Sequence, residues 1–116
     1  MLRDDEWVLD TLLAARKVRA FAEGLTWERF RDDDILQNAI MHQIQIIGEA
    51  ARNVSEEYRS AHAAVPWSQI LGMRNQLVHH YFRILPKRVW EMVEHDIDPL
   101  IAALEPLAPP PPEAGR

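Results

Sequence analysis

The sequence contains no cysteine, and this absence excludes several kinds of protein at once. None of its 116 residues can form a disulfide, supply a thiolate to zinc or an iron–sulfur cluster, or act as a thiol nucleophile. A chain of this length forms one domain, and 47% hydrophobic residues suffice for a core without such cross-links. A reducing, intracellular compartment fits this composition.

Long apolar runs and basic charge are also scarce. No stretch approaches the ~18 apolar residues of a membrane span, and the N-terminal residues lack the basic-then-apolar order of a signal peptide. We therefore expect a cytoplasmic protein with no membrane contact. The formal net charge is −5, from 13 Lys and Arg against 18 Asp and Glu. Any nucleic-acid role therefore needs a local cationic site, because phosphate binding requires clustered cations.

Proline is concentrated at one end of the chain. Five of the eight prolines lie in the last 11 residues, which have too few apolar positions to bury a face. We expect residues 1–105 to form the folded domain and residues 106–116 a proline-rich, disordered tail.

The folded part is predicted to be all-α, an up-and-down bundle of about four to five helices. Apolar residues recur at three- and four-residue steps in a first helix that Asp4 or Asp5 caps and that Gly24 ends, after about Glu23. The same spacing predicts a second helix over about residues 33–54. Candidate caps for it are Thr26, Asp32, Asp33 and Asp34.

Shorter helices follow. Ser55 is placed to cap a short helix, and a fourth helix begins near Pro66. A fifth begins at Pro86, and Pro99 predicts a break in it near Ile97 because proline removes a backbone donor.

The second helix carries apolar residues on more than one side, which is typical of a helix buried on more than one side. In so short a chain, the second side indicates another protomer, and we expect a symmetric homodimer. One stripe is wholly apolar and consists of Leu36, Ile40, Ile44, Ile47, Ala51 and Val54. The other is mixed and consists of Ile35, Ala39, His42, Ile46, Glu49, Ala50 and Asn53.

The fourth helix has an arginine in the middle of its apolar stripe. That stripe consists of Trp67, Ile70, Leu71, Leu77, Val78, Tyr81 and Phe82. Arg74 must be paired or must meet an anion, because a lone buried guanidinium is very costly. One interpretation is a structural ion pair with a carboxylate such as Glu49. The other is an active site formed with polar neighbours, namely Asn75, His79, His80 and Tyr81.

Geometry limits the second interpretation. In a straight helix Arg74 and His79 lie about 140° apart around the axis. If both act on one phosphate, either the helix unwinds near Val78 or the two groups come from two protomers. A symmetric dimer would then form one composite cleft.

Residues 66–82 closely resemble the signature of HepT-like proteins of the HEPN superfamily, the group also labelled DUF86. The string Gly-Met-Arg-Asn-x-Leu-x-His-x-Tyr-Phe contains the family's core motif, in which Arg, His and Tyr correspond to Arg74, His79 and Tyr81. Residues 46–51, Ile-Ile-Gly-Glu-Ala-Ala, resemble the family's second-helix motif, and Val89 and Trp90 resemble its last helix. The resemblance covers about residues 2–105.

The resemblance implies the toxin of a two-gene, type VII-like HEPN/MNT toxin–antitoxin system with a HEPN-like helical fold. Such toxins are homodimeric, metal-independent endoribonucleases. For this chain we accordingly expect no cofactor and an RNA substrate, with tRNA and mRNA as the candidates. The cognate antitoxin is a minimal nucleotidyltransferase (MNT) that neutralises the toxin by AMPylation of the motif tyrosine, here Tyr81.

The residue chemistry agrees with that reaction. His79 can serve as general base or acid near neutral pH, and Arg74 can stabilise charge that develops on the phosphate. Asn75 can orient the phosphate or His79. His80 stands where relatives usually have another residue, so either histidine is a candidate for proton transfer. Further on, Arg83, Lys87 and Arg88 form either a local basic rim for RNA or an ordinary solvated surface.

Two other functions remain open. The chain can be a non-catalytic HEPN module that binds nucleotide or a nucleotidyltransferase partner, or a purely structural helical dimeriser. A metal site is not expected, because the remaining histidines have no ligand spacing. These are His42, His62 and His95.

Overall fold

A computed structural model describes residues 2–79 and 85–108, with the side chains of residues 2, 78 and 79 left out. Within these ranges the chain forms seven helices and no strand, which confirms the predicted all-α class. The helices are α1 (Leu2–Phe21), α2 (Trp27–Arg31), α3 (Asp34–Arg52), α4 (Glu56–Ala61), α5 (Trp67–His79), α6 (Pro86–His95) and α7 (Ile97–Leu104). None of these helices is both long and apolar enough to cross a bilayer.

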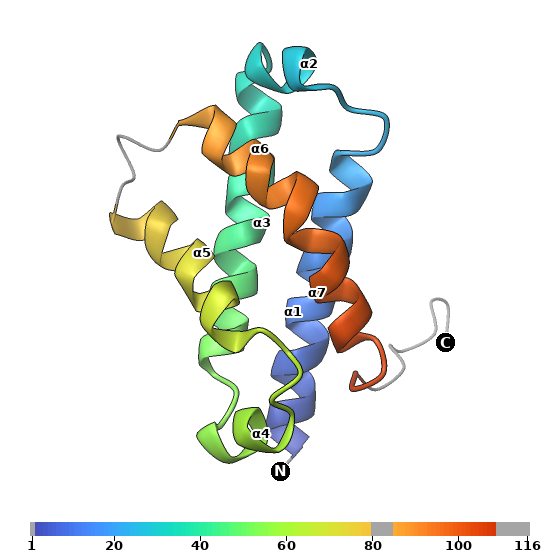
Figure 1. Ribbon diagram of the computed structural model, residues 1–116, viewed down its shortest axis with the longest axis vertical. Coiled ribbons are helices and arrows are strands. Elements are labelled where there is room, and N and C mark those ends of the chain that lie inside the picture. The colour runs from blue at the N-terminus through green and yellow to red at the C-terminus, as the bar shows by residue number, and fades with distance from the viewer. Residues whose placement is uncertain (1, 80–84, 109–116) are drawn as a thin grey trace.

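The three long helices form one layer, with α3 between α1 and α5 (Figure 1). The successive helices α1, α3 and α5 run in alternating directions, as expected for an up-and-down bundle (Figure 1). The α6–α7 pair crosses one face of this layer, and the resulting body measures 42 × 35 × 20 Å. Only one face of the α1–α3 pair is therefore covered by other helices of the described chain.

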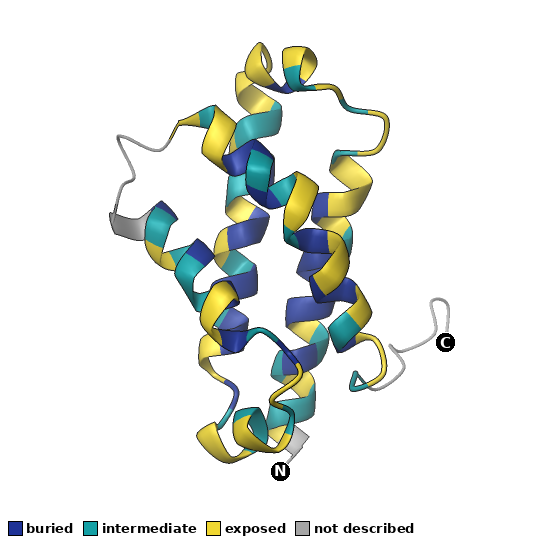
Figure 2. Ribbon diagram, in the orientation of Figure 1, coloured by how far each residue is buried: buried dark blue, intermediate teal, exposed yellow. Residues whose placement is uncertain are grey.

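The core lies where α6 and α7 cross α1 and α3 (Figure 2). The predicted apolar stripes of α1 and α3 supply much of it. Their fully or almost fully buried members are Val8, Leu12, Ala15, Val18, Ile40, Ile44, Ile47 and Ala51. The opposing helices contribute Val89, Met92, Ile97, Leu100, Ile101 and Leu104. A ring cluster of Trp27, Phe30 and Trp90, with centroids 5.4–6.5 Å apart, closes the end of the core near α2.

Local caps explain most of the helix boundaries. Asp33 accepts a hydrogen bond from the Leu36 amide at 2.9 Å and begins α3, and Ser55 accepts from the Tyr58 amide at 3.1 Å and begins α4. Gly24 adopts φ +67°, a left-handed conformation, in the turn that follows α1. The predicted break near Ile97 is confirmed, because α6 ends at His95 and α7 begins two residues later.

Two predicted caps were assigned wrongly. Asp4 and Asp5 lie inside α1, which already begins at Leu2. Instead of capping, the Asp4 carboxylate accepts hydrogen bonds from the backbone N–H and the hydroxyl of Ser55, each at 2.8 Å. Thr26 caps the separate short helix α2, where it accepts from the Arg29 amide at 3.3 Å.

The mixed stripe of α3 remains uncovered along much of its length. Ile35 is 84% exposed, and His42 and Asn53 are exposed as well. At the other end of the chain, Leu107 and Ala108 pack partly against the core. The predicted disordered tail falls mainly on residues 109–116, outside the described residues, and stays a prediction.

Candidate active site

Arg74 lies at a point where α5 packs tightly against α3. Its Cβ and Cγ rest on Gly48, and a Cβ added to residue 48 would overlap both atoms. The absence of a side chain at Gly48 therefore lets the two helices meet at this point. Trp67, Ile70, Met73 and Leu77 of α5 are buried beside the contact, as the apolar stripe of this helix predicts for all but Met73.

The next residue of α3 holds the arginine head group. Arg74 donates from Nε to Oε1 of Glu49 at 2.9 Å, and its Nη2 lies 2.8 Å from the same oxygen. On the other side, Nη1 donates to Oδ1 of Asn75 at 3.2 Å. The Arg74 side chain is only 17% exposed, whereas that of Glu49 is 45% exposed. The ion pair considered from the sequence is thus present.

This pairing leaves part of the guanidinium available to a ligand. Arginine has five N–H bonds, and two of them donate hydrogen bonds, one to Glu49 and one to Asn75. Among the described residues no acceptor is hydrogen-bonded to the other three, one on Nη1 and two on Nη2, although Nη2 lies beside the Glu49 carboxylate. Two adjacent N–H groups on a planar fork match two oxygens of a phosphate.

The structure describes only some of the residues predicted to form the site. Arg74 and Asn75 are adjacent on α5, and the backbone of His79 ends that helix. His80 and Tyr81 lie outside the described residues, as does Arg83. The helix is continuous through residue 78, so it does not unwind there, and positions 74 and 79 are about 140° apart around its axis.

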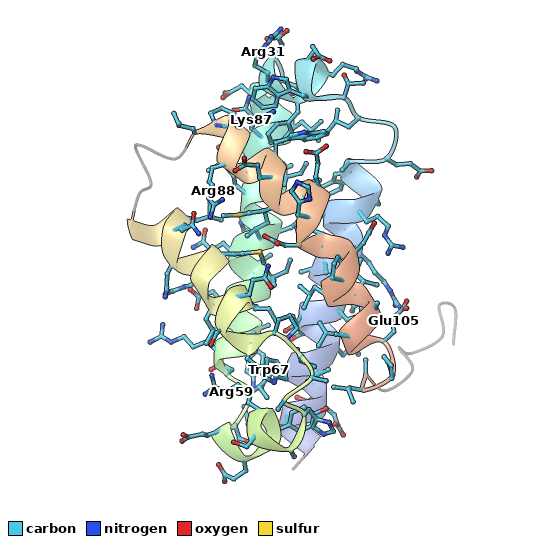
Figure 3. All side chains as sticks on the ribbon, viewed as in Figure 1. Arg31, Arg59, Trp67, Lys87, Arg88 and Glu105 are labelled. Atoms are coloured by element: carbon cyan, nitrogen blue, oxygen red, sulfur yellow. The ribbon has the colours of Figure 1, made fainter. Side chains whose placement is uncertain are left out.

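The two described members of the predicted basic rim make contacts within the fold. Arg88 donates from Nε to Gln76 Oε1 at 2.9 Å, which links α6 to α5, and pairs with Glu91 at 3.3 Å. The Lys87 ammonium lies 4.5 Å from the centre of the Trp27 ring. Figure 3 shows Lys87 beside α2 and Arg88 on the side of α6 that faces α5.

Other candidate groups are dispersed. His42 and His95 are exposed, and the His62 ring lies 4.3 Å from the Tyr58 ring, centre to centre. Within residues 2–79 and 85–108 no three His, Asp or Glu side chains are grouped to hold a metal ion.

Glu49 also borders an open groove of about 610 Å³ between α1 and α3. Apolar side chains such as Leu13 and Ile46 line this groove, together with the charged Asp10 and Lys17. We call it the α1–α3 groove. It lies on the part of α3 that carries the mixed stripe, so Glu49 connects the groove with the Arg74 site.

Sequence reasoning named Arg74, Asn75 and Glu49, but it missed the role of Gly48. That residue appeared only as part of a family motif. The signal that could have shown this role was a glycine within a helix that must pack on two sides. Because glycine has no side chain, it allows another helix to approach closely at that position.

Comparison with known proteins identifies the family of this chain. Residues 11–107 match the family described as "Ribonuclease HepT-like". The chain belongs to the HepT-like ribonuclease family. This membership confirms the resemblance seen in the motif of Arg74, and it indicates ribonuclease activity at the level of the family.

Several relatives in this family have similar lengths. The chain is 38% identical over 78 residues to "Putative RNase TTE0752" of Caldanaerobacter subterraneus subsp. tengcongensis. The matched region covers 67% of this chain and 70% of that protein. It is 31% identical to "Putative RNase MJ1380" of Methanocaldococcus jannaschii, over 78% of this chain and 84% of the relative. It is 29% identical to "Probable ribonuclease HepT" of Thermococcus cleftensis, over 88% of this chain and 93% of the relative. No solved structure matches the chain.

Proposed function

We propose that this protein is a metal-independent endoribonuclease and the toxin of a HEPN/MNT toxin–antitoxin pair. The observation that carries the proposal is the Arg74 guanidinium, which Glu49 and Asn75 hold while N–H groups of Nη1 and Nη2 remain for a phosphate. The names of the relatives and the family match support an RNase. Among the described residues of the site, Arg74 supplies the cation.

The reaction that suits these groups is an internal transesterification of RNA. The ribose 2′-oxygen attacks the adjacent phosphorus and gives its proton to a general base. The bond from phosphorus to the 5′-oxygen then breaks, and a general acid protonates that oxygen. His79 is our candidate for proton transfer, and Arg74 stabilises the charge on the phosphorane. Asn75 orients the guanidinium, and His80 is a second candidate for proton transfer.

The catalytic unit in this proposal is a symmetric homodimer. Because α5 is continuous, residues 74 and 79 of one chain lie on different sides of the helix. A second chain related by a two-fold axis would bring His79 of one protomer to Arg74 of the other. The uncovered mixed stripe of α3 and the α1–α3 groove support a protomer contact beside the site. The cleft between the two chains then receives RNA, such as tRNA or mRNA.

Control of this activity is assigned to an antitoxin partner. The cognate MNT-type nucleotidyltransferase transfers AMP from ATP to the hydroxyl of Tyr81, two residues after His79, with loss of the phenolic proton and release of pyrophosphate. The new phosphodiester places a negative charge and a bulky nucleoside beside the site, and both oppose RNA binding.

Cleavage of total RNA and tRNA in EDTA tests the proposal, with intact mass confirming that Tyr81 carries no AMP. We expect cleavage by the parent protein and none by Arg74→Ala or His79→Ala. Arg19→Ala is the matched control, because Arg19 also pairs with a carboxylate, Asp98, but lies on α1. Absence of cleavage by the bare parent protein contradicts the nuclease. Equal cleavage by the His79 variant contradicts its role.

A second function has one observation in its favour. The Glu49 carboxylate cancels much of the Arg74 charge that would stabilise a phosphorane, whereas N–H donors of the guanidinium remain for a nucleotide phosphate. This favours a module that binds nucleotide, or a nucleotidyltransferase partner, without catalysis. Binding of AMP that is lost in Arg74→Ala, with no RNA cleavage under any condition, identifies the nucleotide-binding module.

A further inference from the structure

We propose that Glu49 is a positioning residue that fixes the orientation of the Arg74 guanidinium, so that its Nη1–Nη2 edge is presented to the RNA phosphate. This inference rests on the proposed ribonuclease function. Glu49 itself touches neither RNA nor the reacting atoms in this arrangement. It acts through the hydrogen bond that it accepts from Arg74 Nε and through its ion-pair contact with Nη2.

The first argument is the geometry of the grip. A guanidinium is planar, and its Nε–H and one Nη2–H point along the same edge. Both of these groups lie within 2.9 Å of Glu49 Oε1. Rotation about the Cδ–Nε bond would break this pair of contacts. The edge formed by Nη1 and Nη2 is therefore held on the side away from the carboxylate.

The second argument is the fixed base of the side chain. The Cβ and Cγ atoms of Arg74 lie against Gly48, directly before Glu49 on the same helix. Asn75 adds a hydrogen bond to Nη1. The stem, one edge and one terminal nitrogen are thus all restrained, and the side chain is only 17% exposed. Such a guanidinium does not have to change its orientation when a phosphate binds. Its N–H groups can therefore stabilise the charge of the transition state without a free-energy cost for reorientation.

The third argument is electrostatic and distinguishes positioning from affinity. The Glu49 carboxylate repels a phosphate bound to the same arginine. Its 45% exposure allows water to screen part of this repulsion, but not all of it. Glu49 therefore weakens RNA binding in the ground state while it improves the geometry of the reaction. A residue with only a structural role would not separate KM from kcat in this way.

The kinetic test compares Glu49→Ala, Glu49→Gln and the control Asp98→Asn. Asp98 is also the carboxylate of an exposed Arg–carboxylate pair, with Arg19, and belongs to α7. For Glu49→Ala we expect kcat for RNA cleavage to fall about 10- to 100-fold with KM unchanged or lower. Glutamine keeps an acceptor oxygen without the charge, so we expect Glu49→Gln to keep kcat within about threefold and to lower KM. Asp98→Asn leaves both constants unchanged.

A spectroscopic test does not depend on turnover. We expect the Arg74 Nε–H resonance in ¹H–¹⁵N spectra to be protected from water exchange in the parent protein and in Glu49→Gln, and to lose protection in Glu49→Ala. Arg74→Lys assigns the resonance. Titration with inorganic phosphate then shows whether perturbation at Arg74 depends on residue 49.

The outcomes separate this inference from the proposed function. If the parent protein cleaves no RNA, the nuclease proposal fails, and the NMR experiment still tests the positioning role. An unchanged kcat or an unchanged Arg74 resonance in Glu49→Ala overturns the inference. A higher kcat in both variants also overturns it, because Glu49 would then be only an inhibitory counter-ion. If Glu49→Ala does not fold, Glu49→Gln decides: a kcat loss as large as that of Arg74→Ala contradicts the inference.

Discussion

Gly48 of α3 lies directly against the Cβ and Cγ atoms of Arg74 of α5. The contact joins the two helices at the residue that carries the candidate site. Because glycine has only a hydrogen in place of a side chain, α3 and α5 can pack closely and the Arg74 side chain can lie between them. A change at Gly48 should therefore affect both the stability of the protein and the position of the guanidinium.

Gly48→Ala should destabilise the protein and displace Arg74. The added Cβ must push α3 and α5 apart, and overpacking of this kind costs about 1–3 kcal/mol. Gly72 on α5 is the matched control, because a Cβ there meets nothing within 4 Å. We expect Gly72→Ala to gain about 0.5–1 kcal/mol from helix propensity. Urea unfolding measures both, and similar values for the two variants would contradict the close-contact explanation.

Arg74→Lys should abolish most activity while the charge is kept. A lysine ammonium has no planar fork and cannot bind Glu49 along one edge and a phosphate along another. We expect cleavage to fall about 10²- to 10³-fold, as when a transition-state donor is removed, and stability to fall by about 1 kcal/mol. Gel assays and thermal unfolding measure the two effects. Arg19→Lys serves as the control, and an equal loss of cleavage there would point to general instability.

The Asp4–Ser55 link should make stability sensitive to acid. Hydrogen bonds from the Ser55 amide, and then from its hydroxyl, lower the pKa of Asp4 below its ordinary value. A carboxylate with a lowered folded pKa stabilises the protein above its unfolded pKa of about 3.9 and loses this effect as the pH falls through the folded pKa. Asp4→Asn should therefore be less stable than the parent at pH 7.

The difference between Asp4→Asn and the parent should shrink progressively below about pH 4. Thermal unfolding from pH 2 to 7 follows this change. Asp5→Asn is the control, since Asp5 makes no side-chain hydrogen bond to the described residues. A difference that stays constant with pH would contradict the link.

Asp96, between α6 and α7, should have the opposite pH dependence. Burial raises the pKa of Asp96, although Arg88, His95 and the hydrogen bond from Gln69 oppose the shift. Since the folded pKa lies above the unfolded one, this contribution to stability is complete below about pH 3.9 and is lost as the pH rises through the folded pKa. The ionised carboxylate is therefore unfavourable at neutral pH.

Asp96→Asn should raise the melting temperature at pH 7 and leave it unchanged in acid. Asparagine retains an oxygen that can accept the hydrogen bond Gln69 donates at 2.6 Å. Calorimetry at pH 3 and pH 7 provides the measurement. A lower melting temperature at pH 7 would show that the charge of Asp96 stabilises the α6–α7 junction.

Much of the fold was predictable because its signals are local. Asp33, Ser55 and Pro86 begin helices through bonds or ring geometry within a few residues, and the apolar stripes repeat with the helical period. The wrong caps have long-range causes. Asp4 is bound by Ser55, 51 residues away, and α2 is fixed by packing of Phe30 on Trp90. Contacts between residues so far apart in the chain cannot be read from local patterns in a single sequence.

The candidate site divides in the same way. A buried arginine requires a carboxylate, so the pairing of Arg74 with Glu49 was foreseeable from the helix stripes. The close approach at Gly48 was not, because the distance between two helices depends on the whole interface. The homodimer, the tail and the roles of His79, His80 and Tyr81 stay predictions.

The docking of α7 on α1 has a consequence for how the chain is made. The pairs Arg16–Glu105 and Arg19–Asp98 join residues 89 and 79 positions apart. At a translation rate of about 5–20 residues per second, α1 waits roughly 4 to 18 seconds for these partners. During that interval its apolar face has no α7 to cover it. The nascent chain therefore exposes apolar surface that can aggregate until α7 emerges from the ribosome.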